Sequence, residues 1–151
     1  MVEVRVAESK AEREDAFGVR HEVFVEEQGV DEELEYDEHD PDAVHFVAYD
    51  GGEAVGAARL RELEGGAAKV ERVAVLEPRR EEGIGRELMT AVESRARELA
   101  LGTLKLHSQT HAADFYRDLD YDRRGEEFDE AGIPHVEMRK RLNESDTPSR
   151  E

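Results

Sequence analysis

The chain has 151 residues and no cysteine, and its formal net charge of −18 arises from 39 acidic against 21 basic side chains. This length is sufficient for one domain with a sizeable core. The lack of cysteine excludes disulfides, thiolate catalysis and cysteine-ligated metals. No apolar run approaches the 18 residues of a transmembrane helix, and the N-terminus does not read as a signal peptide, so we expect a cytoplasmic protein.

The acidic residues are spread along the whole chain instead of forming one tail. A high net charge keeps a protein soluble, but the like-charged side chains repel one another and destabilise the fold unless salt screens them. At about 1 M salt the Debye length is only roughly 3 Å, so the composition indicates adaptation to a salty cytoplasm. No basic face is evident, and we therefore expect neither nucleic acid nor an anionic membrane as a partner.

The first half of the chain reads as a strand, a helix and three further strands. Alternating residues predict a strand over residues 2–7, and the capping-box pair Ser9 and Glu12 predicts a helix that runs to about Glu27. An acidic loop over residues 29–43 follows. Two strands, 43–50 and 53–63, then form a hairpin around Gly51-Gly52, and a second Gly-Gly turn leads into a strand over 67–76.

After Pro78 the spacing of the apolar residues changes from that of a strand to that of a helix. Apolar side chains at helical spacing predict a helix over residues 83–100, ended by Gly102. A strand (103–108), a short helix (110–119) and two strands (121–128 and 135–142) follow. This order predicts an α/β (α+β) fold, with a mixed central sheet of about six to seven strands flanked by three to four helices. We assign residues 1–142 to a single domain and expect the polar tail, 143–151, to be disordered.

The segment "PRREEGIGRELM" (Pro78–Met89) combines a strand end, a loop with Gly83 and Gly85, and a helix start. The first amides of a helix have no internal partner and carry the positive end of its dipole. Glycines let a ligand approach that backbone, so the segment favours a phosphate or pyrophosphate site. It is neither a Walker loop nor a dinucleotide fingerprint. Alternatively, the two glycines only allow the backbone to turn from the loop into the helix, and no ligand binds there.

Three separated motifs carry a resemblance to a known family. The Arg80-x-x-Gly83-x-Gly85 loop after "RVAV" and the segment "QTHAADFYRDLDY" (Gln109–Tyr121) resemble the acyl-CoA loop and the tyrosine segment of the GNAT N-acetyltransferases. The segments "RHEVFVEEQGV" and "EEFDEAGIPHVEM" are similar to those of its small ElaA-like branch. The resemblance spans nearly the whole chain, and the motifs occur in the expected order.

Some positions depart from the family pattern. Glu81 stands where the family usually has glycine, and Glu82 where a lysine or another small or basic residue is common. Gln109 replaces the usual asparagine, and Asp120-Tyr121 replaces Gly-Phe. These changes either weaken cofactor binding or have little effect, because the backbone amides act at short range while the glutamates point to solvent and are screened by salt.

The resemblance implies an N-acetyltransferase that moves an acetyl group from acetyl-CoA to a primary amine of a small molecule or peptide by direct attack, without a metal. The pantetheine arm would lie between two splayed strands and pair with the backbone of Val73 and Val75 like an added strand. The residues implied to hold the cofactor are Val73, Ala74, Val75, Arg80, Glu81, Glu82, Gly83, Ile84, Gly85, Arg86 and Gln109.

The transfer needs an acid for the leaving thiolate and a base for the amine. Tyr116 stands at the family's position for the acid, and its ordinary pKa near 10 keeps it protonated; alternatively it is a core aromatic. Glu71 is the first candidate for the base, acting through a water, and its alternative is a solvated strand residue. His111 and His135 are the other candidates for the base.

Arg20, Phe24 and His135 are expected to shape or contact the acceptor pocket. The acidic segment 31–42 has three interpretations: a metal site without recognised ligand spacing, a surface that attracts a cationic amine, or, as we favour, a solvated surface. The resemblance leaves a homodimer open. Two other functions remain as alternatives, a non-enzymatic CoA-binding sensor and an acyltransferase like the acylhomoserine-lactone synthases.

Overall fold

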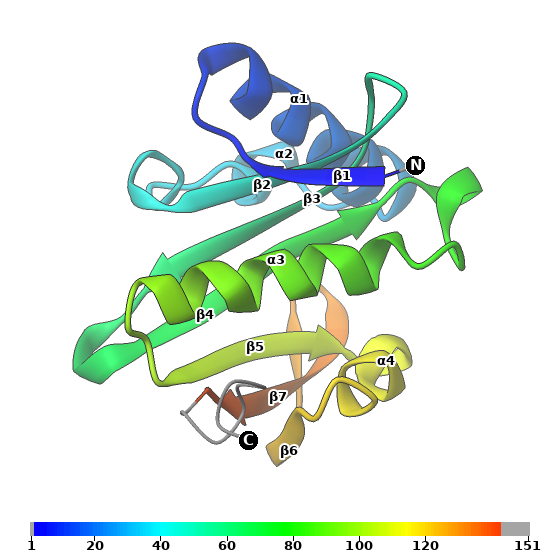
Figure 1. The fold of residues 1–151 in the computed structure, drawn as a ribbon. Helices are drawn as coiled ribbons and strands as arrows, with labels where there is room; N and C mark the ends of the chain where they lie inside the picture. The colour runs from blue at the N-terminus through cyan, green and yellow to red at the C-terminus, as the bar shows by residue number, and fades with distance from the viewer. Residues whose placement is uncertain (1, 143–151) are drawn as a thin grey trace.

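The computed structural model describes residues 2–142, which form one seven-stranded sheet in the order β1-β2-β3-β4-β5-β7-β6 (Figure 1). The strands are β1 (Val2–Val6), β2 (Val44–Asp50), β3 (Glu53–Glu62), β4 (Ala67–Val75), β5 (Thr103–Gln109), β6 (Asp122–Glu130) and β7 (Ile133–Arg141). Neighbouring strands are antiparallel except for β4 and β5, which are parallel. The predicted mixed sheet is confirmed.

Four α-helices accompany the sheet in the described part of the chain, within the predicted three to four, although one of them lies in the segment predicted as an acidic loop. They are α1 (Lys10–Arg20), α2 (Glu32–Glu35), α3 (Ile84–Glu98) and α4 (Ala113–Arg117). The capping box at Ser9 is formed, and the helix predicted to end near Glu27 does so, but its second half, η1 (His21–Glu27), is a π-helix. Short 3-10 turns complete the order: η2 (Asp40–Asp42), η3 (Glu64–Gly66), η4 (Glu77–Arg79) and η5 (Thr110–Ala112).

Helices α1 and α3 cover opposite faces of the sheet (Figure 1). Successive strand residues point to opposite faces, and β2 shows the consequence. Phe46 and Ala48 pack into the core cluster that contains α3, whereas Val47 packs into the cluster that contains α1. Strands β2 and β3 are therefore apolar on both faces, which explains why they read as near-continuous apolar runs.

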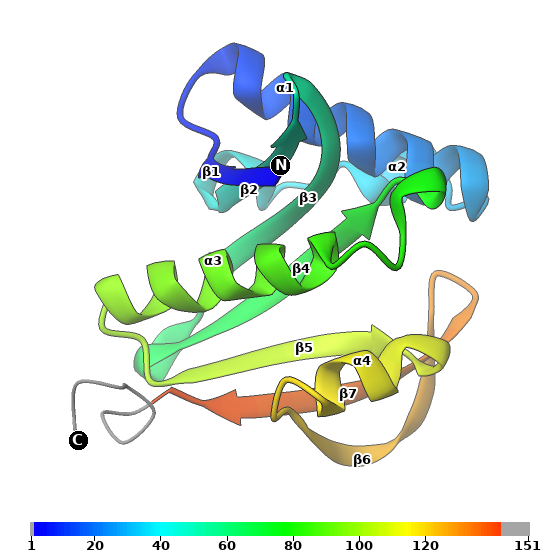
Figure 2. The same ribbon diagram turned by 45° about the vertical axis from the view of Figure 1, so that its right-hand side comes forward.

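The parallel strands β4 and β5 diverge along their length, as Figure 2 shows. Their pairing runs from Ala67 opposite Thr103 to Val70 opposite Leu106 and then stops. Beyond that point β4 continues to Val75 beside β3, and β5 continues beside β7. A wedge thus opens between the two strands at their carboxyl ends, and one side of the β4 backbone there has no partner strand.

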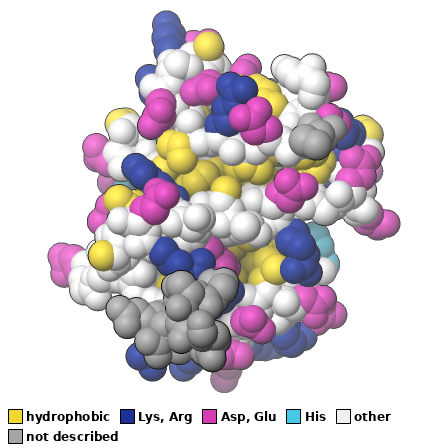
Figure 3. All heavy atoms as spheres, viewed as in Figure 1, with side chains coloured by type: hydrophobic (Ala, Val, Ile, Leu, Met, Phe, Trp, Pro, Cys, Tyr) yellow, Lys and Arg dark blue, Asp and Glu magenta, His cyan; other side chains and the backbone are white. Residues whose placement is uncertain are grey.

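The acidic segment 31–42 is only partly the solvated surface that the sequence suggests, because Asp31, Glu32, Glu33, Glu38 and Asp42 are exposed whereas Glu35 is buried. It forms α2 and η2, and the Glu35 side chain is only 2% exposed. On the face that carries α3, acidic and basic side chains are interspersed (Figure 3). No helix within residues 2–142 has the length and apolar character to cross a membrane. The predicted disorder of 143–151 concerns residues outside the described part.

Candidate active site

A cleft of about 1010 Å³ occupies the wedge between β4 and β5. One end is lined by the loop before α3 and the beginning of that helix, where most of the predicted cofactor residues lie. The other end is lined by polar side chains of β3, β4, β5 and the β6–β7 hairpin. Because both ends belong to one cleft, a long ligand held at α3 could reach the polar side chains of the sheet.

The loop before α3 presents free backbone donors to the cleft. Gly83 caps the helix with a left-handed φ of 87°, and no hydrogen bond from the amides of residues 83–86 is found within residues 2–142. A β-carbon on Gly85 would lie 3.2 Å from Cζ of Phe115, so only glycine packs there without a shift. Such amides at a helix start suit an anion.

The glutamates of this loop differ in their surroundings. Glu81 lines the cleft and has a left-handed φ of 68°, a conformation that favours glycine. Glu82 is exposed and accepts a hydrogen bond of 3.0 Å from Arg79. Arg80 donates to both carboxylate oxygens of Glu27 at 2.7 Å, which ties the loop to the end of η1. An incoming phosphate would therefore compete with Glu27 for Arg80.

Strand β4 carries a bulge that the sequence does not reveal. Arg72 has a φ of 58°, and the register with β3 shifts between Ala57 and Arg59. Left-handed backbone at a non-glycine residue is costly, so contacts elsewhere must hold it. The Arg72 guanidinium donates to the carbonyl oxygens of Leu34 and Glu35 and so fixes both the bulge and α2.

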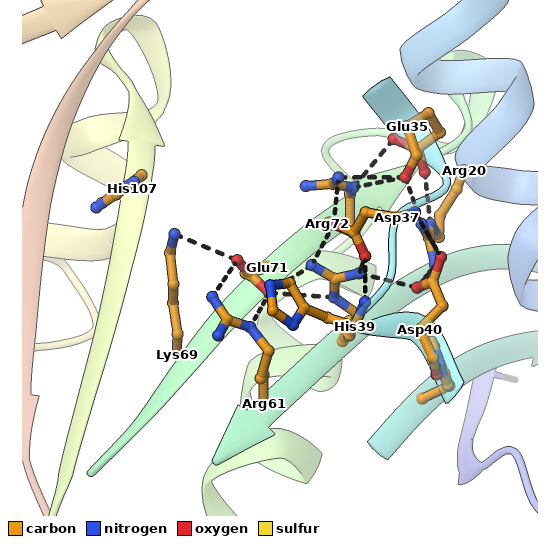
Figure 4. A network of polar contacts seen from close by, with 12 residues as sticks. Arg20, Glu35, Asp37, His39, Asp40, Arg61, Lys69, Glu71, Arg72 and His107 are labelled. Carbon is orange, nitrogen blue, oxygen red and sulfur yellow. Dashed lines mark hydrogen bonds and ion pairs between the residues drawn. The ribbon is translucent and has the colours of Figure 1, made fainter. Parts of the chain in front are cut away.

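An ion-pair network lies beside the bulge (Figure 4). Arg20 donates to Glu35 at 2.5 Å and to Asp40 at 2.9 Å. Arg59, which is fully buried, donates to Asp37 and Asp40 from one nitrogen at 2.7 and 2.8 Å. The acidic segment is thus held against the sheet by arginines, because charges removed from water need partners.

The predicted contact of Arg20 with a substrate is corrected by this network. Arg20 cannot contact a substrate as predicted, since its side chain is 1% exposed and does not line the cleft. Its carboxylate partners hold it in the interior. Within residues 2–142 no group of acidic and histidine side chains has an arrangement that could hold a metal.

Glu71 lines the cleft but is not a solvated strand residue. Its side chain is 9% exposed and accepts from Arg59 at 2.5 Å, from Arg61 at 3.2 Å and from Lys69 at 3.2 Å. Burial alone would raise the pKa of Glu71, but the hydrogen bonds and charges of these three cations outweigh it and lower the pKa to about 2. A carboxylate of such low basicity is a poor acceptor for the proton of an amine.

The opposite wall of the cleft holds His135, His107 and Glu130. Nδ1 of His135 lies 2.6 Å from the carbonyl oxygen of Ile133. A carbonyl can only accept, so Nδ1 carries the proton and the neutral ring keeps a free lone pair on Nε2. His107 lies 2.9 Å from Glu130 through Nδ1. This hydrogen bond is the main cause that lowers the pKa of Glu130.

The predicted residues Tyr116, Gln109, His111 and Phe24 also line the cleft. Tyr116 is 8% exposed and lines the cleft, and its hydroxyl has no hydrogen-bond partner among the described residues. Burial raises the pKa of Tyr116, so it stays protonated. Gln109 receives a hydrogen bond of 2.6 Å from Nε2 of His111 and donates to Gln28 at 2.9 Å. Phe24, on η1, also lines the cleft.

Comparison with known proteins is consistent with this geometry. A family model described as "Acetyltransferase (GNAT) domain" matches residues 7–142. A Bacillus subtilis protein named as the uncharacterized N-acetyltransferase YjcF is 42% identical over 136 residues, which cover 89% of this chain and 96% of that protein. The chain belongs to the GNAT acetyltransferase family, whose members use acyl-CoA and act on amines.

Solved structures agree with this assignment. The crystal structure of an N-acetyltransferase from Lactobacillus plantarum has a TM-score of 0.88 and 30% identity, and the match covers 94% of this chain and 99% of that one. Escherichia coli ElaA follows with a TM-score of 0.82 and 25% identity, over 93% and 99% of the two chains. The resemblance to the ElaA-like branch is confirmed.

Proposed function

We propose that the protein binds acetyl-CoA in the wedge between β4 and β5 and transfers the acetyl group to a primary amine by direct attack. The observation that carries this proposal is the juxtaposition of an unpaired β4 backbone with free amides at the start of α3, in one cleft. The fit is chemical: a pyrophosphate needs clustered amide donors, and a pantetheine arm needs an open strand edge.

Acetyl-CoA supplies an activated acyl thioester. Residues 83–86 would hold its phosphates through their amides, assisted by Arg80 and Arg86, and the backbone of Val73 and Val75 would hold its arm. Glu81 and Gln109 would border the ligand, while Ala74 and Ile84 support the walls with buried side chains. Glu82 is exposed, pairs with Arg79 and does not line the cleft. The acetyl group would then face the polar end of the cleft.

The proton transfers are assigned to two residues. As the new C–N bond forms and the C–S bond breaks, Tyr116 would give its proton to the leaving sulfur, since its free hydroxyl lines the cleft. Nε2 of His135 would take the proton of the amine, since the Ile133 carbonyl fixes the tautomer that leaves this nitrogen unprotonated. Glu71 is left with a structural role in orienting Arg61 and Lys69.

Two measurements test this function. Acetyl-CoA at 100 times its Kd should stabilise the folded protein by about 2.7 kcal/mol, visible as a rise in Tm that AMP does not match. Tyr116→Phe should keep that rise but lower the rate of free-thiol release with an amine by about 100-fold or more. An unchanged rate in Tyr116→Phe would remove this residue from the mechanism, and an absent Tm rise would refute the proposed cofactor.

A further inference from the structure

The polar end of the cleft has one cationic wall, although the protein as a whole is strongly acidic. Arg61 on β3 and Lys69 and Arg72 on β4 line the cleft, with side chains that are 24%, 16% and 20% exposed. Each side chain is therefore partly accessible to a ligand. Figure 4 shows Arg61, Lys69 and Arg72 around Glu71, with Lys69 extending toward the strand that carries His107.

Arg72 is paired with Glu35 and Asp37, so the positive charge left for a ligand on this wall belongs to Arg61 and Lys69. Glu71 is the one carboxylate that Arg61 and Lys69 contact among the described residues, and it is shared with the buried Arg59. Three cations thus compete for two oxygens. The Lys69 ammonium has three donors and one carboxylate within reach, so it can bind a further acceptor without breaking its existing pair.

The opposite wall of the cleft carries a carboxylate and two histidines instead of cations. Glu130 on β6 lines the cleft, is 44% exposed, and accepts from His107. His135 has its Nε2 4.0 Å from Glu130, on the same wall. Lys69 is near enough to Glu130 for its charge to be felt there. The cleft is therefore polarised over a short span, from cations on β3 and β4 to a carboxylate and imidazoles on β5, β6 and β7.

We propose that the acceptor is an amine that also carries an anionic group, a carboxylate or a phosphate. Its anionic group would lie against Lys69 and Arg61, and its amine would face Glu130 and His135. This inference rests on the proposed function, whose acceptor it specifies. A diamine would fit badly, since its second ammonium would face the cationic wall.

The acidic segment does not alter this polarity. Glu35, Asp37 and Asp40 are each paired with one or more of the arginines of the network. These three charges are used inside the protein, and the exposed acidic residues of the segment do not line the cleft. The cleft's own side chains, and not the overall charge of −18, decide which amines bind.

The first test is binding of inorganic phosphate to protein that is already saturated with CoA, which occupies the α3 loop. Phosphate should raise the Tm of the wild type more than that of Lys69→Gln or Arg61→Gln, with an apparent affinity about tenfold weaker in each variant. Lys10→Gln is the matched control, because it removes the same charge from an 85% exposed side chain outside the cleft. Any general stabilisation by phosphate is equal in all four proteins.

The second test is turnover with acetyl-CoA and four amines of similar length: butylamine, γ-aminobutyrate, O-phosphoethanolamine and putrescine. One of the two anionic amines should have the highest kcat/KM, and its KM should rise about tenfold in Lys69→Gln, while the KM for acetyl-CoA stays constant. Preference for γ-aminobutyrate would identify a carboxylate, and preference for O-phosphoethanolamine a phosphate.

Two results would overturn the proposal. One is putrescine or butylamine as the best acceptor; the other is a phosphate response that is the same in the wild type, Lys69→Gln, Arg61→Gln and Lys10→Gln. A failure of the proposed function looks different, because CoA itself would then give no rise in Tm. The comparison of phosphate binding between the wild type and Lys69→Gln still decides the anion site in that case.

Discussion

Replacing Glu81 with glycine should both stabilise the protein and tighten its binding of CoA. Glu81 has a φ of 68°, in the region where a β-carbon crowds the backbone. Left-handed backbone costs a non-glycine residue roughly 1–2 kcal/mol, whereas glycine in the unfolded chain costs about 0.4–1 kcal/mol of extra entropy. The difference predicts a net gain in the free energy of unfolding of about 0.5 kcal/mol.

The charge of Glu81 acts on a separate quantity, the affinity for CoA. Two unit charges about 7 Å apart in water interact by about 0.6 kcal/mol, so removing a carboxylate beside two phosphates is worth about 1 kcal/mol. We expect the Kd for CoA to fall roughly fivefold at low salt. In about 1 M KCl the Debye length is roughly 3 Å, and the benefit should vanish.

Glu81→Ala is the matched control, because it removes the same charge but keeps a β-carbon. Both variants should bind CoA more tightly at low salt, as measured by calorimetry, and only Glu81→Gly should have a higher urea midpoint. A glycine variant no more stable than the alanine variant would refute the backbone argument. A Kd that is unchanged at low salt in both would show that the carboxylate does not face the phosphates.

Three further predictions concern the whole fold. Arg20→Ala removes one of the two arginines that pair with each of Glu35 and Asp40, and it should cost about 3 kcal/mol in urea unfolding. Lys10→Ala should stay within about 0.5 kcal/mol, and equal losses in the two variants would contradict the importance of the network. The pKa of Glu71 is lowered to about 2 in the folded protein, so its ionised form contributes about 3 kcal/mol to the free energy of unfolding. This contribution is complete above the unfolded-state pKa near 4.5 and is lost as the pH falls toward 2. The urea midpoint should therefore drop through this pH window, and it should drop less steeply in Glu71→Gln. The net charge of −18 predicts a Tm that rises between about 0.05 and 1 M KCl, and a flat Tm would contradict the interpretation of the composition as salt adaptation.

The sequence by itself determined the strands, the helices other than α2, and the strand–loop–helix arrangement before α3. Strand alternation, the Ser9 capping box and the Gly-Gly turns are local signals, because they depend on residues within a few positions of one another. The loop around Gly83 and Gly85 is also local, since a strand end and a helix start are adjacent in the chain. For these features the structure agrees with the sequence prediction.

Only the tertiary structure decided which charges line the polar end of the cleft and which residues of the acidic segment are buried. The arginine that neutralises Glu35 lies 15 positions away, and the arginine that holds Asp37 lies 22 positions away. Such pairs arise from the order of strands in the sheet, which no local pattern encodes. The bulge at Arg72 was equally hidden, because its left-handed φ is imposed by contacts with α2 and not by a glycine. The same strand order surrounds Glu71 with Arg59, Arg61 and Lys69, and these cations make it a poor candidate for the base.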